Sequence, residues 1–528
     1  RKTFVREMKD RRTERRERFG AHSYLLEPHL KEGRGGLRDM QAMLWTARVV
    51  FGLSSLDDIE DAGLLLPDEK QQFQVALDFL KRLRIRLHYL SKRKNDRLYF
   101  ELQAEVAEAF GYLTDGSILP VEAFMRDLYS QLECVSLVTD LFFDHVDEVL
   151  GLEAAVEVQD RLIEKGIEVR RGKLHLTADR QMVEKKPHIV VRLFLAMART
   201  GLPLHHRTRK LVSSYAALLQ GQLLQSPRLN KPILSILLEA KDIFSVLEIM
   251  LESRVLPAVI PELQGIVSLA QHDLYHIYTV DRHSLQTVAE LRGVVEEYPM
   301  AFSAVDVPAV LYLSALLHDV GKGAGRDHSE VGAEVVGGIA RRFGFSEEQC
   351  SDIEFLVLYH LFIPENALRR DLNDTAFIQR CAEIIGTTSR LAMLYLLSVA
   401  DSRATGPSAW SDWKGALMNE MYLKVLAAIE HAEEDSELEC FHEHVEQGVG
   451  WLRRQLADLL AKKEVIFDQD VLPADYLLSF DVDTVLAHIK VYQEKYNLLR
   501  QKSYIEPVDS GDEWQLLCMS LDRPGLLA

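Results

Sequence analysis

The sequence predicts a mainly α-helical protein with several helical units, one short β-hairpin and a single strand near its end. Apolar residues recur at a spacing near 3.6 over most of the 528 residues. Hydrophobic residues make up 47% and charged residues 27% of the chain, as in an ordinary globular protein. The length exceeds the roughly 250 to 300 residues at which one hydrophobic core stops growing, so we expect two to four units.

The first 150 residues are predicted to be helical. Residues 71–89 carry apolar side chains at the spacing of an amphipathic helix. The exception is the run Gly-Arg-Gly-Gly at residues 33–36, which predicts a loop that opens a helix at Leu37. A glycine-rich loop before a helix can bind phosphate through its backbone N–H groups, but a plain turn explains this loop better.

Short β elements are predicted in two places. Residues 166–177 read as a hairpin, because two alternating apolar runs flank an Arg-Gly turn. Residues 513–521 read as a strand and residues 522–525 as the turn after it. Nothing is predicted to pair with this strand, and a lone strand leaves its backbone groups unsatisfied. We therefore expect a domain cut short at this end, and a first residue of Arg in place of Met indicates a cut at the other.

The net charge and the cysteine content exclude some classes of protein. A formal net charge of −18 argues against a nucleic-acid-binding protein. The five cysteines form no CxxC pair, which favours a reducing compartment, and we expect the cytoplasm. No apolar run approaches the ~20 residues that span a bilayer, so no membrane partner is expected. Residues 1–18 carry nine basic side chains against four acidic ones, which predicts a solvated helix face or a docking site for an anionic partner.

A metal-binding pair ends one of the predicted helices. Residues 306–317 predict an apolar helix that is followed at once by His318 and Asp319 and then by Val-Gly-Lys. An imidazole nitrogen beside a carboxylate oxygen suits Mn, Fe, Zn or Mg. The similar pair His272 and Asp273 lacks the Gly-Lys that follows and is not assigned to the site.

Four further candidate ligands lie on neighbouring predicted helices. His283 falls in the first turn of a helix that Asp281 could cap, and His328 begins another. His360 shares its helix face with apolar residues and so faces inward, where a satisfied core histidine is the alternative. Asp401 also lies on an apolar face, and a buried carboxylate is costly without a partner such as an ion.

These side chains together would suffice for two divalent ions about 3.5 to 4 Å apart, an arrangement typical of hydrolases. Asp319 is the candidate to bridge the ions. Lys322 is the candidate to neutralise a phosphate oxygen in the transition state, with a surface lysine as the alternative. The six predicted metal ligands are His283, His318, Asp319, His328, His360 and Asp401.

The order of these residues resembles the H, HD, D pattern of the HD superfamily of metal-dependent phosphohydrolases, which are helical bundles. Longer motifs are similar to the bifunctional uridylyltransferase/uridylyl-removing enzymes of bacterial nitrogen regulation. The motifs near the site are residues 276–285, 317–322, 327–333 and 400–407. On the flanks, residues 27–39 and 86–98 resemble the helical region after that family's nucleotidyltransferase core, and residues 522–526 resemble the opening of its ACT domains.

The resemblance implies removal of UMP from a tyrosine of the PII signal protein, with Mg or Mn as the metal. Glutamine would be sensed by ACT domains of the full-length protein. The sequence has no Gly-Ser followed by paired Asp, the transferase signature, and His29 and Arg34 depart from the family's glycine-rich motif. The resemblance also implies five consecutive regions. Residues 1–150 are the helical region that follows the nucleotidyltransferase core, and residues 151–260 are a helical linker with the hairpin. Residues 261–420 are the HD domain, residues 421–508 are a helical connector, and residues 509–528 are the start of an α+β ACT domain.

Two other functions stay open. HD sites share their ligands and differ in the walls of their pockets, so the substrate could be a small nucleotide such as an alarmone or a cyclic dinucleotide. Alternatively, the helical region could be a scaffold that binds PII, with a structural ion and no turnover. Hydrolysis of free nucleotides would favour the first of these, and tight metal binding without turnover would favour the second.

Overall fold

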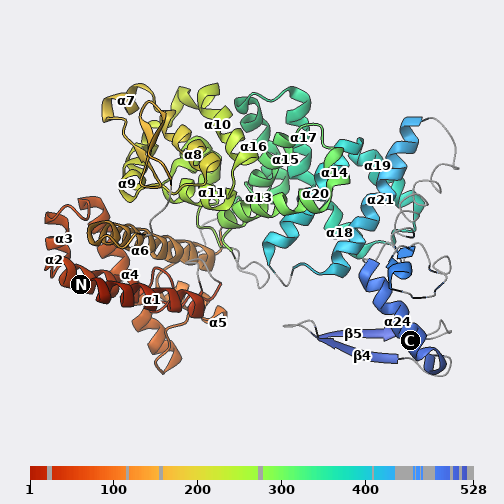
Figure 1. Cartoon of the computed structure of the whole chain (residues 1–528), viewed down its shortest axis with the longest axis horizontal. Helices are drawn as coiled ribbons and strands as arrows, with labels where there is room; N and C mark the ends of the chain where they lie inside the picture. The colour runs from red at the N-terminus through yellow and green to blue at the C-terminus, as the bar shows by residue number, and fades with distance from the viewer. Residues whose placement is uncertain are drawn as a thin grey trace. The chain divides into compact units, whose positions relative to one another are not determined.

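The structure of the chain, a computed structural model, is mainly helical, as the sequence predicts (Figure 1). It describes residues 1–20, 26–113, 118–153, 158–270, 278–406, 409–434, 482–499, 504–509 and 514–519, and scattered positions between 453 and 472. The chain divides into two units. The first comprises Arg1–Phe362 and Ala392–Trp410, and the second comprises Ile363–Leu391 and Ser411–Ala528. Every candidate metal ligand belongs to the first unit.

Six helices make up the N-terminal part of the first unit. They are α1 (Lys2–Phe19), α2 (Leu37–Phe51), α3 (Leu56–Asp61), α4 (Pro67–Ser91), α5 (Phe100–Ala109) and α6 (Pro120–Leu150). A proline at the first position begins α4 and α6, where its missing N–H costs nothing. A glycine in the left-handed conformation ends α2 and α6. The predicted start of a helix at Leu37 is confirmed.

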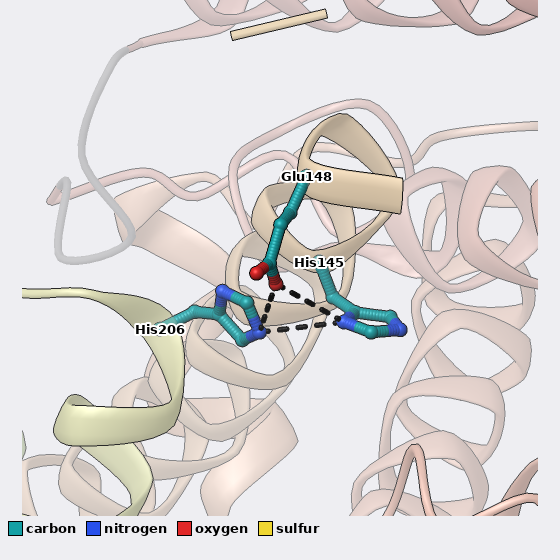
Figure 2. A group of neighbouring side chains, drawn as sticks. All are labelled: His145, Glu148 and His206. Carbon is teal, nitrogen blue, oxygen red and sulfur yellow. Dashed lines mark hydrogen bonds and ion pairs between the residues drawn. The ribbon is translucent and has the colours of Figure 1, made fainter. Parts of the chain in front are cut away.

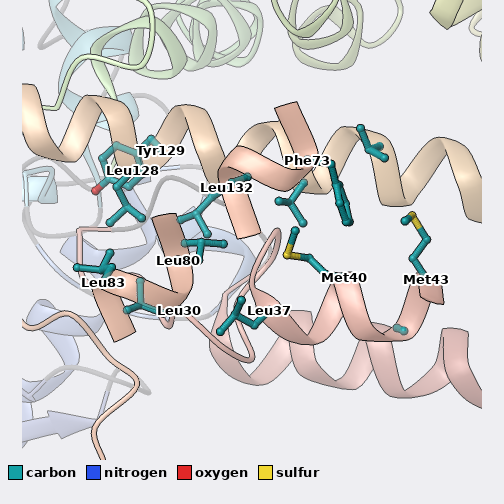
Figure 3. Packing of buried hydrophobic residues seen from close by; sticks show 14 of the residues in the cluster. Leu30, Leu37, Met40, Met43, Phe73, Leu80, Leu83, Leu128, Tyr129 and Leu132 are labelled. Atoms are coloured by element: carbon teal, nitrogen blue, oxygen red, sulfur yellow. The ribbon is translucent and has the colours of Figure 1, made fainter. Parts of the chain in front are cut away.

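The core of these helices is a layer of α2 and α4 side chains beneath the long helix α6 (Figure 3). Phe73 and Leu80 of α4, Met40 of α2 and Leu132 of α6 are each at most 2% exposed. Complete burial of one such side chain contributes about 1.5 to 3 kcal/mol. The apolar spacing read from residues 71–89 therefore marks the inner face of α4 correctly.

The glycine-rich run at residues 33–36 is a turn packed tightly against α6. A Cβ on Gly35 would lie 1.9 Å from the Leu132 carbonyl oxygen, and the residue has a φ of +74°. Its backbone N–H donates to Asp39 Oδ2 at 3.1 Å. Packing against α6 thus accounts for this glycine without a bound phosphate.

The basic helix α1 lies against acidic side chains of its own unit. Arg12 is buried and donates to Asp39 at 3.3 Å and to Asp140 at 2.7 Å. Burial raises the pKa of Asp140, but nearby guanidinium groups, led by that of Arg12, outweigh burial and lower it to about 2. The cations of α1 with an acidic partner include Lys9, Arg12, Arg15 and Arg16. These four of the nine basic side chains are thus engaged within the chain.

A small antiparallel sheet follows, with strand order β1-β2-β3. The predicted hairpin is confirmed as β2 (Ile167–Arg170) and β3 (Lys173–Leu176). Arg171 and Gly172 between them both have positive φ, which a tight hairpin turn with the right twist requires. The edge strand β1 (Arg161–Glu164) was not predicted, because its side chains are largely exposed and lack an apolar alternation.

Short helices lead from this sheet toward the metal ligands. They are α7 (Arg180–Lys185), α8 (Ile189–Thr200), α9 (His206–Tyr215), α10 (Pro227–Glu239), α11 (Ile243–Glu252) and α12 (Val255–Val259), with 3-10 turns at Ala216–Leu218, Gly221–Gln225 and Pro261–Gly265. The helices that hold the ligands are α13 (Val280–Glu297), α15 (Pro308–Leu317), α16 (His328–Phe343), α17 (Glu347–Tyr359) and α20 (Thr388–Thr405), and α14 (Pro299–Ser303) joins the first two.

Helix α15 is the centre of this bundle. Its residues 310–317 are all buried, and it packs against α13 and α17. A helix that is apolar on every side is stable only inside a protein. The chain therefore carries the two residues after α15, His318 and Asp319, into the interior.

The second unit contains α19 (Thr375–Ile385), α21 (Asp412–Glu434), α24 (Val482–Leu499) and most of α18 (Phe362–Arg369). The predicted C-terminal strand is confirmed as β5 (Trp514–Met519). The expectation that it has no partner is wrong, because β4 (Tyr504–Asp509) pairs with it in antiparallel register. Pro507 within β4 lacks a backbone donor, a feature that is rare inside strands and weakens the strand pattern of residues 504–509. The predicted turn at residues 522–525 lies outside the described residues.

None of the helices in the described part of the chain has both the length and the apolar character needed to cross a membrane.

Replacing Gly35 with Ala is expected to destabilise the N-terminal helices by about 2 to 4 kcal/mol, because left-handed strain adds to the clash with Leu132. Gly52 is the matched control, since it has a φ of +80° and no atom within 4 Å of an added Cβ. Its replacement should cost only the strain, about 1 to 2 kcal/mol. Urea unfolding followed by circular dichroism measures both, and equal shifts in the midpoint would contradict the packing role.

Candidate metal centre

The six predicted ligands meet at the ends of five helices in the first unit. His283 lies in the first turn of α13, His318 and Asp319 directly follow α15, and His328 is the first residue of α16. The two remaining candidates are His360, which directly follows α17, and Asp401, which lies near the end of α20. Five of the six are buried and His328 is partly exposed.

Three of these side chains form a first group. His283 Nε2 lies 2.8 Å from Asp401 Oδ1, and His318 Nε2 lies 3.3 Å from His283 Nε2. His318 Nε2 is also 3.6 Å from Asp401 Oδ1. Two imidazole nitrogens and one carboxylate oxygen therefore face a common point, which fits a single cation.

Asp319, His328 and His360 form a second group. Asp319 Oδ1 lies 3.7 Å from His328 Nε2 and 3.8 Å from His360 Nε2. The other oxygen, Oδ2, faces the first group, at 3.3 Å from His318 Nε2 and 3.7 Å from His283 Nε2. One carboxylate thus presents an oxygen to each group.

Backbone carbonyls set the tautomer of two of the histidines. His318 Nδ1 lies 2.9 Å from the Ala315 carbonyl oxygen, and His360 Nδ1 lies 2.8 Å from that of Val357. A carbonyl only accepts, so each Nδ1 donates and Nε2 is the nitrogen turned toward the other ligands. The Ser398 hydroxyl donates to the His360 carbonyl at 3.1 Å. Such outer contacts orient a ligand before the ion arrives.

Charge in the site favours a cation. Burial lowers the pKa of His318, but the carboxylates of Asp319 and Asp401 outweigh burial and raise it to about 10. Burial also raises the pKa of Asp319, yet Lys322 and His318 hold it well below its usual range. By contrast, burial, reinforced by His318, lowers the pKa of His360 to about 4, which leaves that imidazole neutral.

Lys322 is part of this charge distribution. Its ammonium group lies 2.6 Å from Asp319 Oδ2, and its side chain is only 10% exposed. The alternative of a surface lysine at a helix end is therefore wrong. The site places a positive charge beside the carboxylate that the two groups share.

The donor atoms fit divalent ions. Asp319 Oδ1 is buried and accepts no hydrogen bond from any described residue. The donor pairs quoted for the two groups lie mostly 3.3 to 3.8 Å apart. Ligands held at about 2.0 to 2.2 Å from one ion have similar separations. The His and Asp groups therefore suggest divalent metal binding, and mixed nitrogen and oxygen ligands do not by themselves select one metal.

Two glycines let α16 approach the site. A Cβ on Gly321 would lie 2.2 Å from the His328 carbonyl oxygen and 2.6 Å from the Gly332 backbone nitrogen. A Cβ on Gly332 would lie 2.8 Å from Val357 of α17. The close approach of α16 to α17 therefore requires a residue without a side chain at position 332. Close packing on both sides puts His328 within reach of Asp319.

The prediction that Asp281 caps α13 is wrong. Thr279 is the N-cap residue, and Asp281 lies inside the first turn, where Oδ2 accepts from the Ser268 backbone N–H at 2.7 Å. The carboxylate thus ties the preceding loop to the helix that carries His283. Two residues of difference in the start of a helix are common in a reading from sequence.

Arg282 is a structural residue that the sequence analysis missed. It is 2% exposed and pairs with Glu133 of α6 and, at 3.4 Å, with Glu248 of α11. These pairs hold α13 against two other helices and so position His283, its neighbour in sequence. A buried arginine next to a ligand has no signal in hydrophobic periodicity, because its partners are 149 and 34 residues away.

Comparison with known proteins agrees with this geometry. The family described as GlnD PII-uridylyltransferase matches residues 3–143, and the HD domain family matches residues 280–396. The chain is 32% identical to the bifunctional uridylyltransferase/uridylyl-removing enzyme of Bordetella avium over 535 aligned positions, 99% of this chain. The chain belongs to the GlnD uridylyltransferase/uridylyl-removing enzyme family. The HD match contains all the predicted ligands except Asp401.

Other relatives carry the same description. The protein of Ruegeria pomeroyi is 33% identical over 79% of this chain, and that of Burkholderia pseudomallei is 31% identical over 98%. The matches cover 47% of the Ruegeria protein and 60 to 61% of the other two, so the chain spans only about half to three fifths of their length. A solved tRNA-processing enzyme matches 52% of the chain at 18% identity, with a TM-score of 0.30, too low to bear on the fold.

Replacing Gly321 with Ala is expected to weaken binding at the second group at least tenfold, because the new methyl group would displace the start of α16 and His328. The control is Gly338→Ala in the same helix, where an added Cβ meets nothing within 4 Å. That substitution should leave binding unchanged and stabilise α16 by about 0.5 to 1 kcal/mol. Titration with Mn²⁺ followed by electron paramagnetic resonance measures both, and equal affinities would contradict the packing argument.

Metal uptake is expected to release a proton at neutral pH. His318 has a pKa of about 10 in the metal-free site, so it is protonated at pH 7 and must lose that proton before Nε2 can bind an ion. The apparent affinity should therefore rise with pH until about 10 and fall as the solution is acidified. Calorimetry in two buffers of different ionisation enthalpy counts the protons. Identical heats in both buffers would show that no proton leaves.

Proposed function

We propose that this chain hydrolyses the phosphodiester that joins UMP to a tyrosine of the PII signal protein, with Mg or Mn as the required ion. The observation that carries this proposal is the pair of His and Asp groups that share Asp319. Two cation sites bridged by one carboxylate are an arrangement used for phosphoester hydrolysis. The relatives' name, which includes a uridylyl-removing activity, supports the choice of substrate.

Bound divalent ions would supply a nucleophile from water at neutral pH and neutralise charge on the phosphoryl oxygens. The protein's own contribution is to hold that chemistry in place. His283, His318 and Asp401 would hold one ion, His328 and His360 the other, and Asp319 would contact both. No strong general acid is required, because tyrosine, the leaving group, has a pKa near ~10 and tyrosinate leaves readily.

Lys322 would act on the phosphate in the proposed reaction. Its ammonium group lies beside Asp319 Oδ2, where it balances the buried carboxylate. With ions bound, the Lys322 ammonium group could contact a non-bridging oxygen of the substrate, whose negative charge grows in the transition state. The flexible four-carbon stem of a lysine side chain allows such a change of partner.

The partner and the effector are proposals of the same kind. PII and its uridylylated form would be the macromolecular partners, and glutamine would act through ACT domains of the full-length protein. Transfer of uridylyl groups is not proposed for this chain, because no Gly-Ser followed by paired Asp occurs in its sequence. We place the protein in the cytoplasm, where its cysteines would stay reduced, and Cys134, Cys350 and Cys381 are free thiols.

The direct test is release of UMP from uridylylated PII by this chain. Release is expected with Mn or Mg and should stop with EDTA. Asp319→Ala should lower the rate at least a thousandfold and reduce metal uptake, with the helical circular dichroism retained. Asp78→Ala, an exposed aspartate of α4, is the matched control and should leave the rate unchanged. Full activity of Asp319→Ala would end the two-ion proposal.

Failure of the unaltered, folded and metal-loaded chain to release UMP would contradict the proposed substrate for this chain. A screen of free nucleotides would then separate the alternatives. Hydrolysis of an alarmone or a cyclic dinucleotide would identify a small-nucleotide phosphohydrolase. Tight metal binding without any turnover would identify a scaffold with a structural ion.

A further inference from the structure

A second group of potential metal ligands lies far along the chain from the HD ligands. His145 and Glu148 are three residues apart near the end of α6 and so share one face of that helix. His206 is the first residue of α9 and is 61 residues from His145. Figure 2 shows the three side chains pointing toward one another from these two helices.

The donor atoms of this group have the separations of ligands around one ion. His145 Nδ1 lies 3.3 Å from His206 Nε2. Glu148 Oε2 lies 3.5 Å from His206 Nε2 and 3.9 Å from His145 Nδ1. Ligands at about 2.0 to 2.1 Å from a tetrahedral ion lie roughly 3.3 Å apart. A small inward shift of Glu148 would complete that geometry.

Hydrogen bonding within the protein does not account for the group. One imidazole could donate to the other across the 3.3 Å between His145 and His206. That bond would still leave Glu148 Oε2, a buried oxygen, with no hydrogen bond from any described residue. A buried carboxylate oxygen without a donor costs free energy that a cation would offset.

The neighbouring His205 faces the other oxygen of the carboxylate. Its Nδ1 accepts the Arg207 backbone N–H at 3.3 Å as the cap of α9, so in the neutral ring Nε2 carries the proton. That Nε2 lies 3.6 Å from Glu148 Oε1, the oxygen that turns away from the other two histidines. A small shift would let His205 donate to this oxygen, as the outer partners of metal ligands do.

We propose that His145, Glu148 and His206 bind one transition-metal dication of the Zn²⁺ class. Two imidazole nitrogens and a carboxylate oxygen are ligands that Zn²⁺ accepts readily, and they do not suit Ca²⁺, which prefers oxygen. Glu148 also lines a cavity of about 590 Å³, together with His175, His205 and Arg207. An ion could therefore approach the Glu148 carboxylate from this cavity.

The electrostatics allow such an ion. Burial, followed by the nearby His205 and His145, lowers the pKa of His206 to about 3, so this ligand needs to lose no proton at neutral pH. Arg207 approaches Glu148 Oε2 to 3.8 Å and would repel a cation. Its side chain is 67% exposed, so it can turn into solvent when an ion binds.

The ion would add a link between the N-terminal helices and α9, where Lys210 of α9 already donates to the Leu64 carbonyl at 2.9 Å. It would link the end of α6, the last of the six N-terminal helices, to the start of α9, which follows the small sheet. The start of α9 is itself held to the sheet, because the His205 backbone N–H donates to the Leu174 carbonyl at 3.0 Å. A dication here would therefore add to the links, such as that between Arg282 and Glu133, that hold the N-terminal helices to the rest of the first unit.

The test is the number of Zn²⁺ ions bound by the whole chain. The protein is stripped with a chelator, equilibrated with Zn²⁺ at neutral pH, and analysed by mass spectrometry of the metal. Glu148→Gln keeps the size of the side chain and removes its charge, and His206→Gln removes a nitrogen ligand. The control is His175→Gln, a cavity histidine that stacks on His205 with ring centroids 4.4 Å apart and is no ligand in this proposal.

Glu148→Gln and His206→Gln are each expected to bind one ion fewer than the unaltered chain, while His175→Gln binds the same number. The ligands of the HD centre are unchanged in all four proteins, so the ions bound there do not affect the difference in count. An unchanged count in Glu148→Gln would overturn the proposal even if His206→Gln did not fold. Loss of an ion in His175→Gln as well would also overturn it, because the effect would then follow from disturbing the cavity.

Discussion

The arrangement of the candidate metal centre depends on the buried carboxylate of Asp319 and on its pairing with two positive groups. A charge so deep in a protein requires opposite charge close by, and Lys322 and His318 supply it at 2.6 and 3.3 Å. The carboxylate reaches this depth because α15 is apolar on every side and must lie in the interior. The same oxygens then face one ligand group each. Burial, charge balance and the proposed bridging of two ions are consequences of one placement.

The HD centre and the cluster of His145, Glu148 and His206 differ in the pKa values of their histidines. In the HD centre two carboxylates raise the pKa of His318 to about 10, so a proton occupies the position that an ion would take. Around Glu148 a single carboxylate faces several histidines, and burial lowers the pKa of His206 to about 3. The raised pKa of His318 therefore opposes metal binding at neutral pH, and the lowered pKa of His206 does not.

Reading from sequence succeeded where the cause was local. The inward face of His360 follows from Ile353, Leu356 and Val357, which are all fully buried, and the start of α16 follows from Asp327, which caps it. Prediction from sequence failed for elements whose structure depends on residues elsewhere in the chain. β1 is held by pairing with β2 and not by its own pattern, and β4 contains a proline that hides it. The roles proposed for the ligands and for Lys322, and the five regions, stay predictions.

The sequence by itself determined the helical class, the apolar character of α15 and the set of six candidate ligands, because periodicity, capping and residue chemistry are local properties. Only the tertiary structure decided which Asp319 oxygen faces which group and that Arg282 steadies His283 from α6 and α11. It alone brought His206 to His145, across 61 residues. The physical reason is that such meetings depend on how helices pack, and packing is settled by the summed burial of many side chains far apart in sequence.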